Sequence, residues 1–189
     1  MHSGKKETII LGIDPGTTVL GYGMVLVNQT ELKMVTAGCI KLNKYEDQAT
    51  RLRFIFDRLI TLIDEYHPDE LSIEAPFYGK NVQSMLKLGR AQGVAIAAAL
   101  SRQIPYVEYA PRRIKQAITG NGASSKEQVS AMLKSILKND QLPKELDATD
   151  GLAAAVCHHY SMTGIASMSS GGSKNWDSFI KQNSDRVIK

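Results

Sequence analysis

One stretch near the amino terminus constrains the chain more than any other. It runs Ile9-Ile10-Leu11-Gly12-Ile13-Asp14-Pro15-Gly16, an apolar segment that ends in a carboxylate and a Pro-Gly turn. The β-branched apolar residues predict a buried strand, and Pro15 must end it because proline fixes φ and lacks a backbone donor. Asp14 would then lie at the exposed end of a rigid strand, where a side chain can do chemistry. Hydrogen bonding to the turn amides explains an Asp here equally well.

The composition is that of one ordinary globular domain. The chain has 189 residues, of which 43% are hydrophobic and 22% charged, and a formal net charge of +4. We find no apolar run long enough for a membrane span, no secretory signal, and only two cysteines. We therefore expect a reduced, cytoplasmic protein whose mild positive charge permits a polyanionic partner.

The order of the predicted elements indicates an α/β fold with a mixed sheet. Short turns join the first three strands, and helices join the later ones, so an antiparallel meander should continue into parallel crossovers. Gly21 and Gly23 inside a strand indicate that another element approaches the backbone closely. Residues 164–189 are Ser/Gly-rich and then basic, and we expect a flexible tail after a domain over 1–163. Strands are predicted at 8–13, 21–27, 33–42, 70–74 and 104–109, and helices at 48–66, 83–102, 111–119, 125–137 and 147–163.

Four carboxylates fall where this fold would bring them together. Asp14 and Glu74 each end a predicted strand, and ligands of open α/β sheets gather at the carboxyl ends of strands. Asp147 and Asp150 lie one turn apart on the same face of the last helix. Helix capping by Asp147 and a favourable dipole interaction of Asp150 are the alternative for that pair.

Charge repulsion makes a cation the natural companion of such a cluster. Two unit charges 4 Å apart repel by about 4 kcal/mol at an effective dielectric near 20, and no lysine is obviously paired with these acids. Carboxylate oxygens favour Mg²⁺ or Mn²⁺. Two such ions can activate water and stabilise the leaving oxygen of a phosphodiester, so the pattern favours a metal-dependent nuclease.

Five blocks of sequence, together and in this order, resemble the RuvC family of bacterial Holliday-junction resolvases. The likeness extends over residues 8–163 and leaves the tail unmatched. The blocks are Ile-Leu-Gly-Ile-Asp-Pro-Gly-Thr-Thr at 10–18, Gly-Tyr-Gly at 21–23, Ile-Glu-Ala-Pro-Phe at 73–77, Lys-Leu-Gly-Arg-Ala-Gln-Gly at 87–93 and Asp-Ala-Thr-Asp-Gly-Leu-Ala at 147–153.

The resemblance implies a ribonuclease H-like fold with a five-stranded sheet, a homodimer, and Mg²⁺-dependent paired nicking of four-way DNA junctions in recombination and repair. It implies that Asp14, Glu74, Asp147 and Asp150 are the catalytic, metal-binding acids, with two metal ions per site. The third acid can be His in the family and is Asp147 here. A RuvA–RuvB branch-migration complex is the implied partner.

Basic and aromatic residues near these acids are candidates for DNA binding. Each basic residue alone is better explained as solvated surface, but the set brackets the acids in sequence. An aromatic after Glu74 could be a lid over the core or could stack on unpaired bases, and the family resemblance favours Phe77 over Tyr78 for stacking. By the same resemblance, Lys115 and Lys126 would bind phosphate near the scissile bond. The candidates are Phe77, Lys80, Lys87, Arg90, Arg112, Lys115 and Lys126.

Two further patterns concern helices. Gly89, Gly93 and Ala97 recur every four residues, which suits either packing on the chain's own sheet or the interface of a two-fold dimer. His158 and His159 lie near the end of the last helix, where we expect a favourable interaction with the helix dipole rather than catalysis.

Other functions remain open from the residues alone. Asp-Pro-Gly-Thr-Thr at 14–18 also resembles the phosphate loop of actin-like and sugar-kinase ATPases, but those proteins need a second domain and a second phosphate motif, which we do not find. A nuclease of the same fold that acts on RNA, or a non-catalytic junction-binding module, is the other alternative. The intact acids argue against the non-catalytic module.

Overall fold

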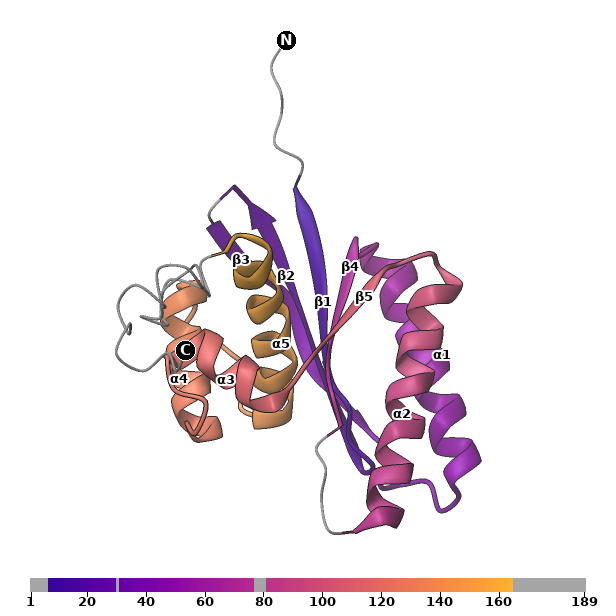
Figure 1. Ribbon diagram of the computed structural model, residues 1–189. Helices are drawn as coiled ribbons and strands as arrows, with labels where there is room; N and C mark the ends of the chain where they lie inside the picture. Colours follow the sequence, from indigo (N-terminus) through magenta and orange to yellow (C-terminus); the bar gives the residue numbers. More distant parts are fainter. Residues whose placement is uncertain (1–6, 30, 77–80, 165–189) are drawn as a thin grey trace, which may run out of the picture.

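The computed structural model describes residues 7–29, 31–76 and 81–164. Five strands and five helices follow one another in these segments (Figure 1). None of the helices in the described segments is long and apolar enough to cross a membrane. The predicted tail lies outside the described residues and stays a prediction. The elements are β1 (Thr8–Asp14), β2 (Val19–Asn28), β3 (Glu31–Lys41), α1 (Gln48–Tyr66), β4 (Glu70–Glu74), α2 (Val82–Ser101), β5 (Tyr106–Tyr109), α3 (Pro111–Thr119), α4 (Lys126–Leu137) and α5 (Leu146–Met162).

The strands form one mixed sheet with β1 at its centre. The spatial order is β3-β2-β1-β4-β5. The pairs β1–β2 and β2–β3 are antiparallel, and β1–β4 and β4–β5 are parallel. The predicted combination of meander and crossovers is confirmed.

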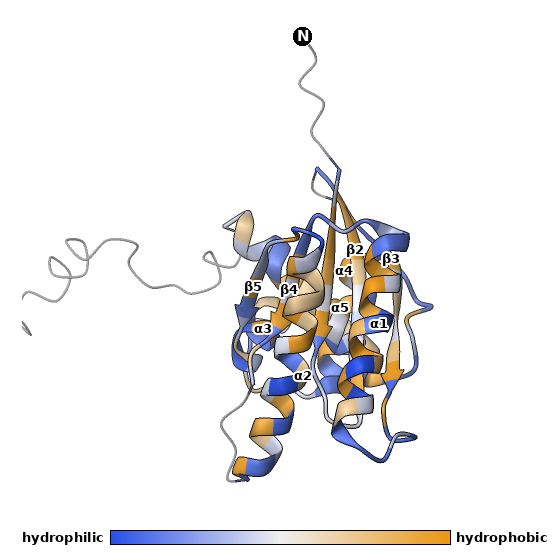
Figure 2. Cartoon of the chain, turned by 90° about the vertical axis from the view of Figure 1, so that its right-hand side faces the viewer, coloured by the Kyte–Doolittle hydropathy of each residue, from blue (hydrophilic) through white to orange (hydrophobic). Residues whose placement is uncertain are grey.

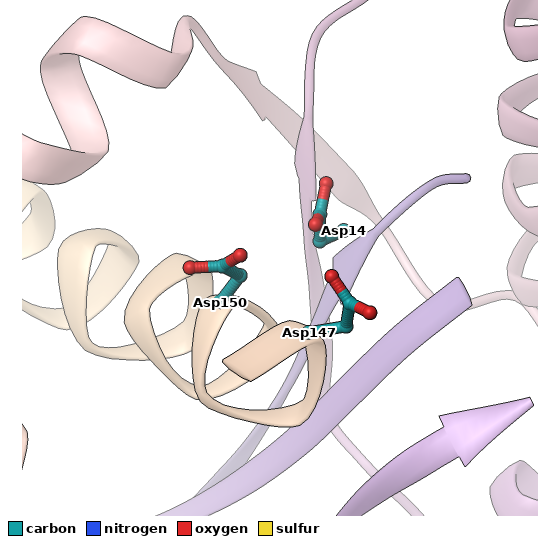
Figure 3. A group of neighbouring side chains, drawn as sticks. All are labelled: Asp14, Asp147 and Asp150. Carbon is teal, nitrogen blue, oxygen red and sulfur yellow. The ribbon is translucent and has the colours of Figure 1, made fainter. Parts of the chain in front are cut away.

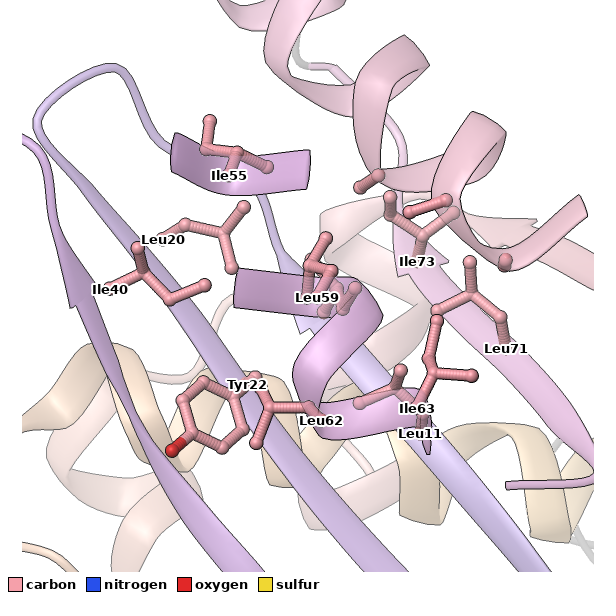
Figure 4. Close-up of a cluster of buried hydrophobic side chains, with 14 of the residues drawn as sticks. Leu11, Leu20, Tyr22, Ile40, Ile55, Leu59, Leu62, Ile63, Leu71 and Ile73 are labelled. Atoms are coloured by element: carbon pink, nitrogen blue, oxygen red, sulfur yellow. The ribbon is translucent and has the colours of Figure 1, made fainter. Parts of the chain in front are cut away.

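Helices cover both faces of the sheet. Helices α1 and α2 lie on one face, and α3, α4 and α5 on the other (Figure 1). Side chains alternate along β1 accordingly: Leu11 and Ile13 belong to the core under α1 and α2, whereas Ile10 belongs to the core under α4 and α5. Figure 4 shows the first of these cores, with Leu59 of α1 against the strands. In Figure 2 hydrophobic colour follows the central strands and alternates with hydrophilic colour around the helices.

Several element boundaries differ from the sequence prediction. Strand β5 begins at Tyr106 rather than at residue 104, because Pro105 has no amide to donate and contributes only its carbonyl, which accepts from Leu71. Helix α5 begins at Leu146, with Glu145 in the cap position and no side-chain cap bond. The alternative role of Asp147 as an N-cap is therefore wrong, and Asp147 lies in the first turn.

Helix α5 packs directly on the backbone of the two central strands. A Cβ atom on Gly12 would lie 2.1 Å from the carbonyl oxygen of Gly151, and one on Gly21 would lie 1.8 Å from that of Asp147. On the helix side, a Cβ on Gly151 would lie 2.6 Å from the backbone of Tyr22. Side chains therefore cannot separate helix and sheet here. This confirms the expectation that an element closely approaches the glycines of the second strand.

Replacing a glycine in this contact should destabilise the protein. We expect Gly12→Ala to lower the free energy of unfolding by about 1–3 kcal/mol, because the added methyl overpacks the α5–β1 contact. Urea denaturation measures the change. The matched control is Ser135→Ala on the exposed surface of α4, where alanine should be neutral or stabilise by about 0.5 kcal/mol. Equal effects of the two substitutions would contradict the close packing.

Candidate metal centre

Neighbouring strands and one helix bring the four predicted acids to the same end of the sheet. Asp14 ends β1 and Glu74 ends the parallel neighbour β4, with Ile13 and Ile73 paired just before them. The close packing of α5 on β1 and β2 brings the first turns of that helix to Asp14. Figure 3 shows Asp14, Asp147 and Asp150 facing a common space.

The acids form two overlapping groups. Asp14, Asp147 and Asp150 each offer a carboxylate oxygen, and these oxygens lie within 4.8 Å of one another. Asp14 and Asp150 also line a cavity of about 220 Å³ together with Glu74, Lys115 and Lys126. Hard oxygen donors at this spacing suit a divalent cation, so the residues present fit a metal site.

Lys126 occupies this cluster with its ammonium group. Its Nζ lies 2.5 Å from Asp150 Oδ2 and 3.2 Å from Asp147 Oδ1. The expectation that no lysine pairs with the acids is therefore wrong. Lys126 opens α4, 21 residues before Asp147, and only the packing of α4 against α5 brings the two together. The cluster thus accepts a cation in this structure, although that cation is a side chain.

Burial is the main cause of the raised pKa values of the acids in this site. It raises the pKa of Asp14 to about 7 and that of Glu74 to about 8. These values already include repulsion from the neighbouring carboxylates, which adds to the effect of burial, and the opposing effect of Lys126. Burial also raises the pKa of Asp150, against the hydrogen bond from Lys126. For Lys126 burial acts against the charge, but the bonds to Asp150 and Asp147 hold its pKa above its usual range.

The predicted basic residues fall in different places. Lys115 of α3 lines the acid cavity together with Lys126, and Arg112 lines an adjoining hollow that Lys115 shares. Lys87 and Arg90 lie exposed on α2 and do not line the acid cavity. Phe77, Tyr78 and Lys80 lie outside the described residues.

His158 has a different role from the one expected. It is buried, and its two ring nitrogens bond to the Tyr109 hydroxyl at 2.8 Å and to Glu70 Oε2 at 2.5 Å. The residue therefore ties α5 to β4 and β5 rather than serving the helix dipole. His159 is also buried, and burial lowers its pKa, which disfavours the charge that a dipole interaction needs. A run of apolar residues before the pair is the signal that could have indicated burial.

Two supporting residues were missed from the sequence. Gln92 of α2 is buried, and its side-chain amide donates to Glu108 at 2.9 Å and to the Glu74 carbonyl at 3.5 Å. Arg51 of α1 donates to the carbonyls of Thr17 and Tyr45, at 3.1 and 2.7 Å. The contact of Gln92 with the Glu74 carbonyl reaches the end of β4, and the bond from Arg51 to the Thr17 carbonyl holds the turn after Asp14. In the sequence both residues read as polar positions of amphipathic helices.

A mixed five-stranded sheet with acids at the ends of its central strands and a facing acidic helix defines a protein of the ribonuclease H-like fold. The family model described as "Crossover junction endodeoxyribonuclease RuvC" matches residues 10–158. The chain belongs to the RuvC family.

Relatives match over nearly the whole chain. Proteins named crossover junction endodeoxyribonuclease RuvC are 57% identical over 185 residues in Christiangramia forsetii (97% of this chain, 94% of that protein) and 58% identical over 181 residues in Cytophaga hutchinsonii (96% and 88%). The structure of Thermus thermophilus RuvC matches with a TM-score of 0.74 and 29% identity, over 83% of this chain and 97% of that one. The same protein in complex with Holliday junction substrate matches with a TM-score of 0.74 and 28% identity, over 83% and 97%.

The raised pKa values predict a pH-dependent gain in stability for an Asp14 variant. Asp14 has a pKa near 4 in the unfolded chain and about 7 in the folded protein. Between these two pH values the folded protein keeps the carboxyl proton that the unfolded chain has lost. Its contribution to stability is complete below about pH 4 and is lost as the pH rises through 7. We expect metal-free Asp14→Asn to unfold a few degrees above wild type at about pH 8, with the gap narrowing as the pH falls below 7 and closing near pH 4. Calorimetry in EDTA measures this, and a gap that widens toward acid pH would contradict it.

Proposed function

We propose that this chain is a Mg²⁺-dependent endonuclease that resolves four-way DNA junctions by paired symmetric nicks, in homologous recombination and DNA repair. The observation that carries the proposal is the convergence of four acids at the strand ends of a RuvC-family fold. An actin-like ATPase or a nuclease for RNA would share parts of the fold. Neither accounts for relatives with 57% identity that are named for crossover junctions.

The four acids Asp14, Glu74, Asp147 and Asp150 are the proposed catalytic and metal-binding residues. The three aspartates are close enough to hold one ion, and a second ion is proposed because two metals together activate water and stabilise the leaving oxygen in phosphodiester hydrolysis. Bound Mg²⁺ would supply an activated water and stabilise the leaving oxygen of the phosphodiester. The raised pKa values of Asp14 and Glu74 fit this role, because a divalent cation would hold both groups in the charged form.

Basic residues around the cavity are proposed to hold the DNA backbone. Lys115 lines the cavity beside the acids. Lys126 forms ion pairs with Asp147 and Asp150 in this structure and would bind a phosphate after these pairs break. Arg112 extends the basic surface into the adjoining hollow. Lys87, Arg90, Lys80 and the stacking role of Phe77 stay proposals that depend on the family resemblance.

A homodimer would follow from the substrate, since two symmetric nicks need two active sites related by a two-fold axis. Helix α2 is the proposed interface. Its buried residues face the core, whereas Val82, Leu86 and Leu100 are 64%, 50% and 52% exposed. A Cβ on Gly89 or Gly93 would meet nothing within 4 Å, so this face does not pack on the chain's own sheet at those glycines. The RuvA–RuvB complex and a cytoplasmic location are proposed from the family resemblance.

Junction cleavage tests the proposed function. We expect the protein with Mg²⁺ to nick a synthetic four-way junction symmetrically and to spare linear duplex of the same sequence. Asp14→Asn should lower the cleavage rate by about 100-fold or more, since even outer-sphere changes at metal sites cost about 10–100-fold. Junction binding should persist because the basic surface is unchanged. Loss of binding in Asp14→Asn would make Asp14 a structural residue instead.

The proposed interface predicts the effect of a bulky residue on α2. Gly93→Leu should shift the dimer toward monomer, because the leucine would keep two α2 backbones apart. Sedimentation equilibrium over a range of concentrations measures the shift. Lys134→Leu, on the exposed surface of α4, adds a leucine away from α2 and should leave the dimer unchanged. A Gly93→Leu protein as dimeric as wild type would place the interface elsewhere.

A further inference from the structure

A basic groove lies at the open edge of the sheet, apart from the acid cavity. It has a volume of about 230 Å³ and is formed by the end of the edge strand β3, the turn after it and α1. We call it the β3–α1 groove. Its lining residues are Cys39, Ile40, Lys41, Lys44, Phe54 and Arg58.

The charge of this groove is one-sided. Three of its lining side chains are cationic and none is anionic. Within the described part of the chain, Lys41, Lys44 and Arg58 have no carboxylate at ion-pair distance. Other exposed cations have a carboxylate partner: Arg53 pairs with Asp57 at 3.6 Å, and Arg102 with Asp64 at 2.7 Å. The groove therefore concentrates positive charge that the protein itself leaves unbalanced.

Aromatic rings hold one of these cations in place. The Nζ of Lys44 lies 5.1 Å from the centre of the Tyr45 ring and 5.0 Å from that of Phe54. The two rings are themselves in contact, with centroids 4.9 Å apart. A cation–π contact positions an ammonium group without cancelling its charge. Lys44 is thus partly ordered before any anion arrives, unlike a freely solvated lysine.

The groove lies at the same end of the sheet as the acids. Lys41 pairs with Val19 at the start of β2, and the Leu42 amide donates to the Thr18 carbonyl at 2.8 Å. Burial and the nearby carboxylates of Asp147 and Glu145 raise the pKa of the Cys39 thiol, so this lining residue lies near the start of α5. The groove therefore lies beside the turn that follows Asp14.

Basic surfaces consequently flank the acid cluster on two sides. Lys115 lies on the side of α3 and α4, and the β3–α1 groove lies across the sheet, at the edge strand. A backbone whose scissile phosphate lies at the acids must continue in both directions. Regularly spaced phosphates are the anions that such separated cations would match.

We propose that the β3–α1 groove binds the phosphodiester backbone of one duplex arm of the junction, on the opposite side of the scissile phosphate from Lys115. This inference rests on the proposed function and adds a second contact surface to it. Because the contact is made to phosphates, it would contribute affinity and orientation without reading base sequence.

Salt dependence of junction binding tests the proposal. Junction affinity is measured by fluorescence anisotropy in EDTA, which prevents cleavage, for wild type and for the double variant Lys44→Gln/Arg58→Gln. Each lost phosphate contact should reduce the slope of log affinity against log salt by about 0.9, so we expect a reduction of roughly 1–2 and an affinity roughly tenfold weaker near 0.1 M salt. The variant Arg58→Lys should keep the wild-type slope.

The matched control removes two positive charges from a different surface of the protein. Lys33 and Lys138 line a hollow formed by the start of β3 and the end of α4, and Lys33→Gln/Lys138→Gln should leave the slope unchanged. Equal slopes for groove and control variants would overturn the groove assignment while leaving the proposed function intact. A wild-type protein that does not bind the junction at all would overturn the proposed function and the groove with it. Equal unfolding temperatures of all variants verify that they fold.

Discussion

Repulsion among carboxylates at one end of the sheet is the constraint on which the site depends. The fold holds Asp14, Asp147 and Asp150 so close that their oxygens lie within 4.8 Å of one another, and burial removes much of the water that would screen Asp14 and Asp150. The pKa of Asp14 rises as a result, and the ammonium of Lys126 enters the cluster. A cation is therefore part of the folded state, whether a lysine or a metal ion supplies it.

The packing of α5 explains why the acids cannot move apart. Gly12 and Gly21 on the strands and Gly151 on the helix let the two backbones touch, so the first turns of α5 stay against the end of β1. Relaxing the repulsion would require lifting the helix and exposing the apolar core beneath it. Buried His158, bonded to Glu70 and Tyr109, ties the other end of the same helix.

Local patterns predicted much of this arrangement. An apolar run ending in Asp14-Pro15 fixes a strand and its last residue, and short turns against helical crossovers fix the mixed sheet. The contacts made by Lys126 and His158 were not predictable in the same way. Each joins elements far apart in the chain, and the side-chain distances depend on how helices pack rather than on local spacing. The roles of Phe77 and the tail stay predictions.

The central claim is that the acid cluster is a cation site, which the ammonium of Lys126 occupies when no metal ion is bound. Manganese binding in the absence of DNA tests this claim. Electron paramagnetic resonance would follow Mn²⁺ affinity in wild type, Lys126→Met and Lys115→Met. Removing the competing ammonium should tighten Mn²⁺ binding by roughly tenfold, about 1.4 kcal/mol. Lys115→Met, which lines the cavity without an ion pair to the acids, should change it much less. Unchanged or weaker binding in Lys126→Met would contradict the account.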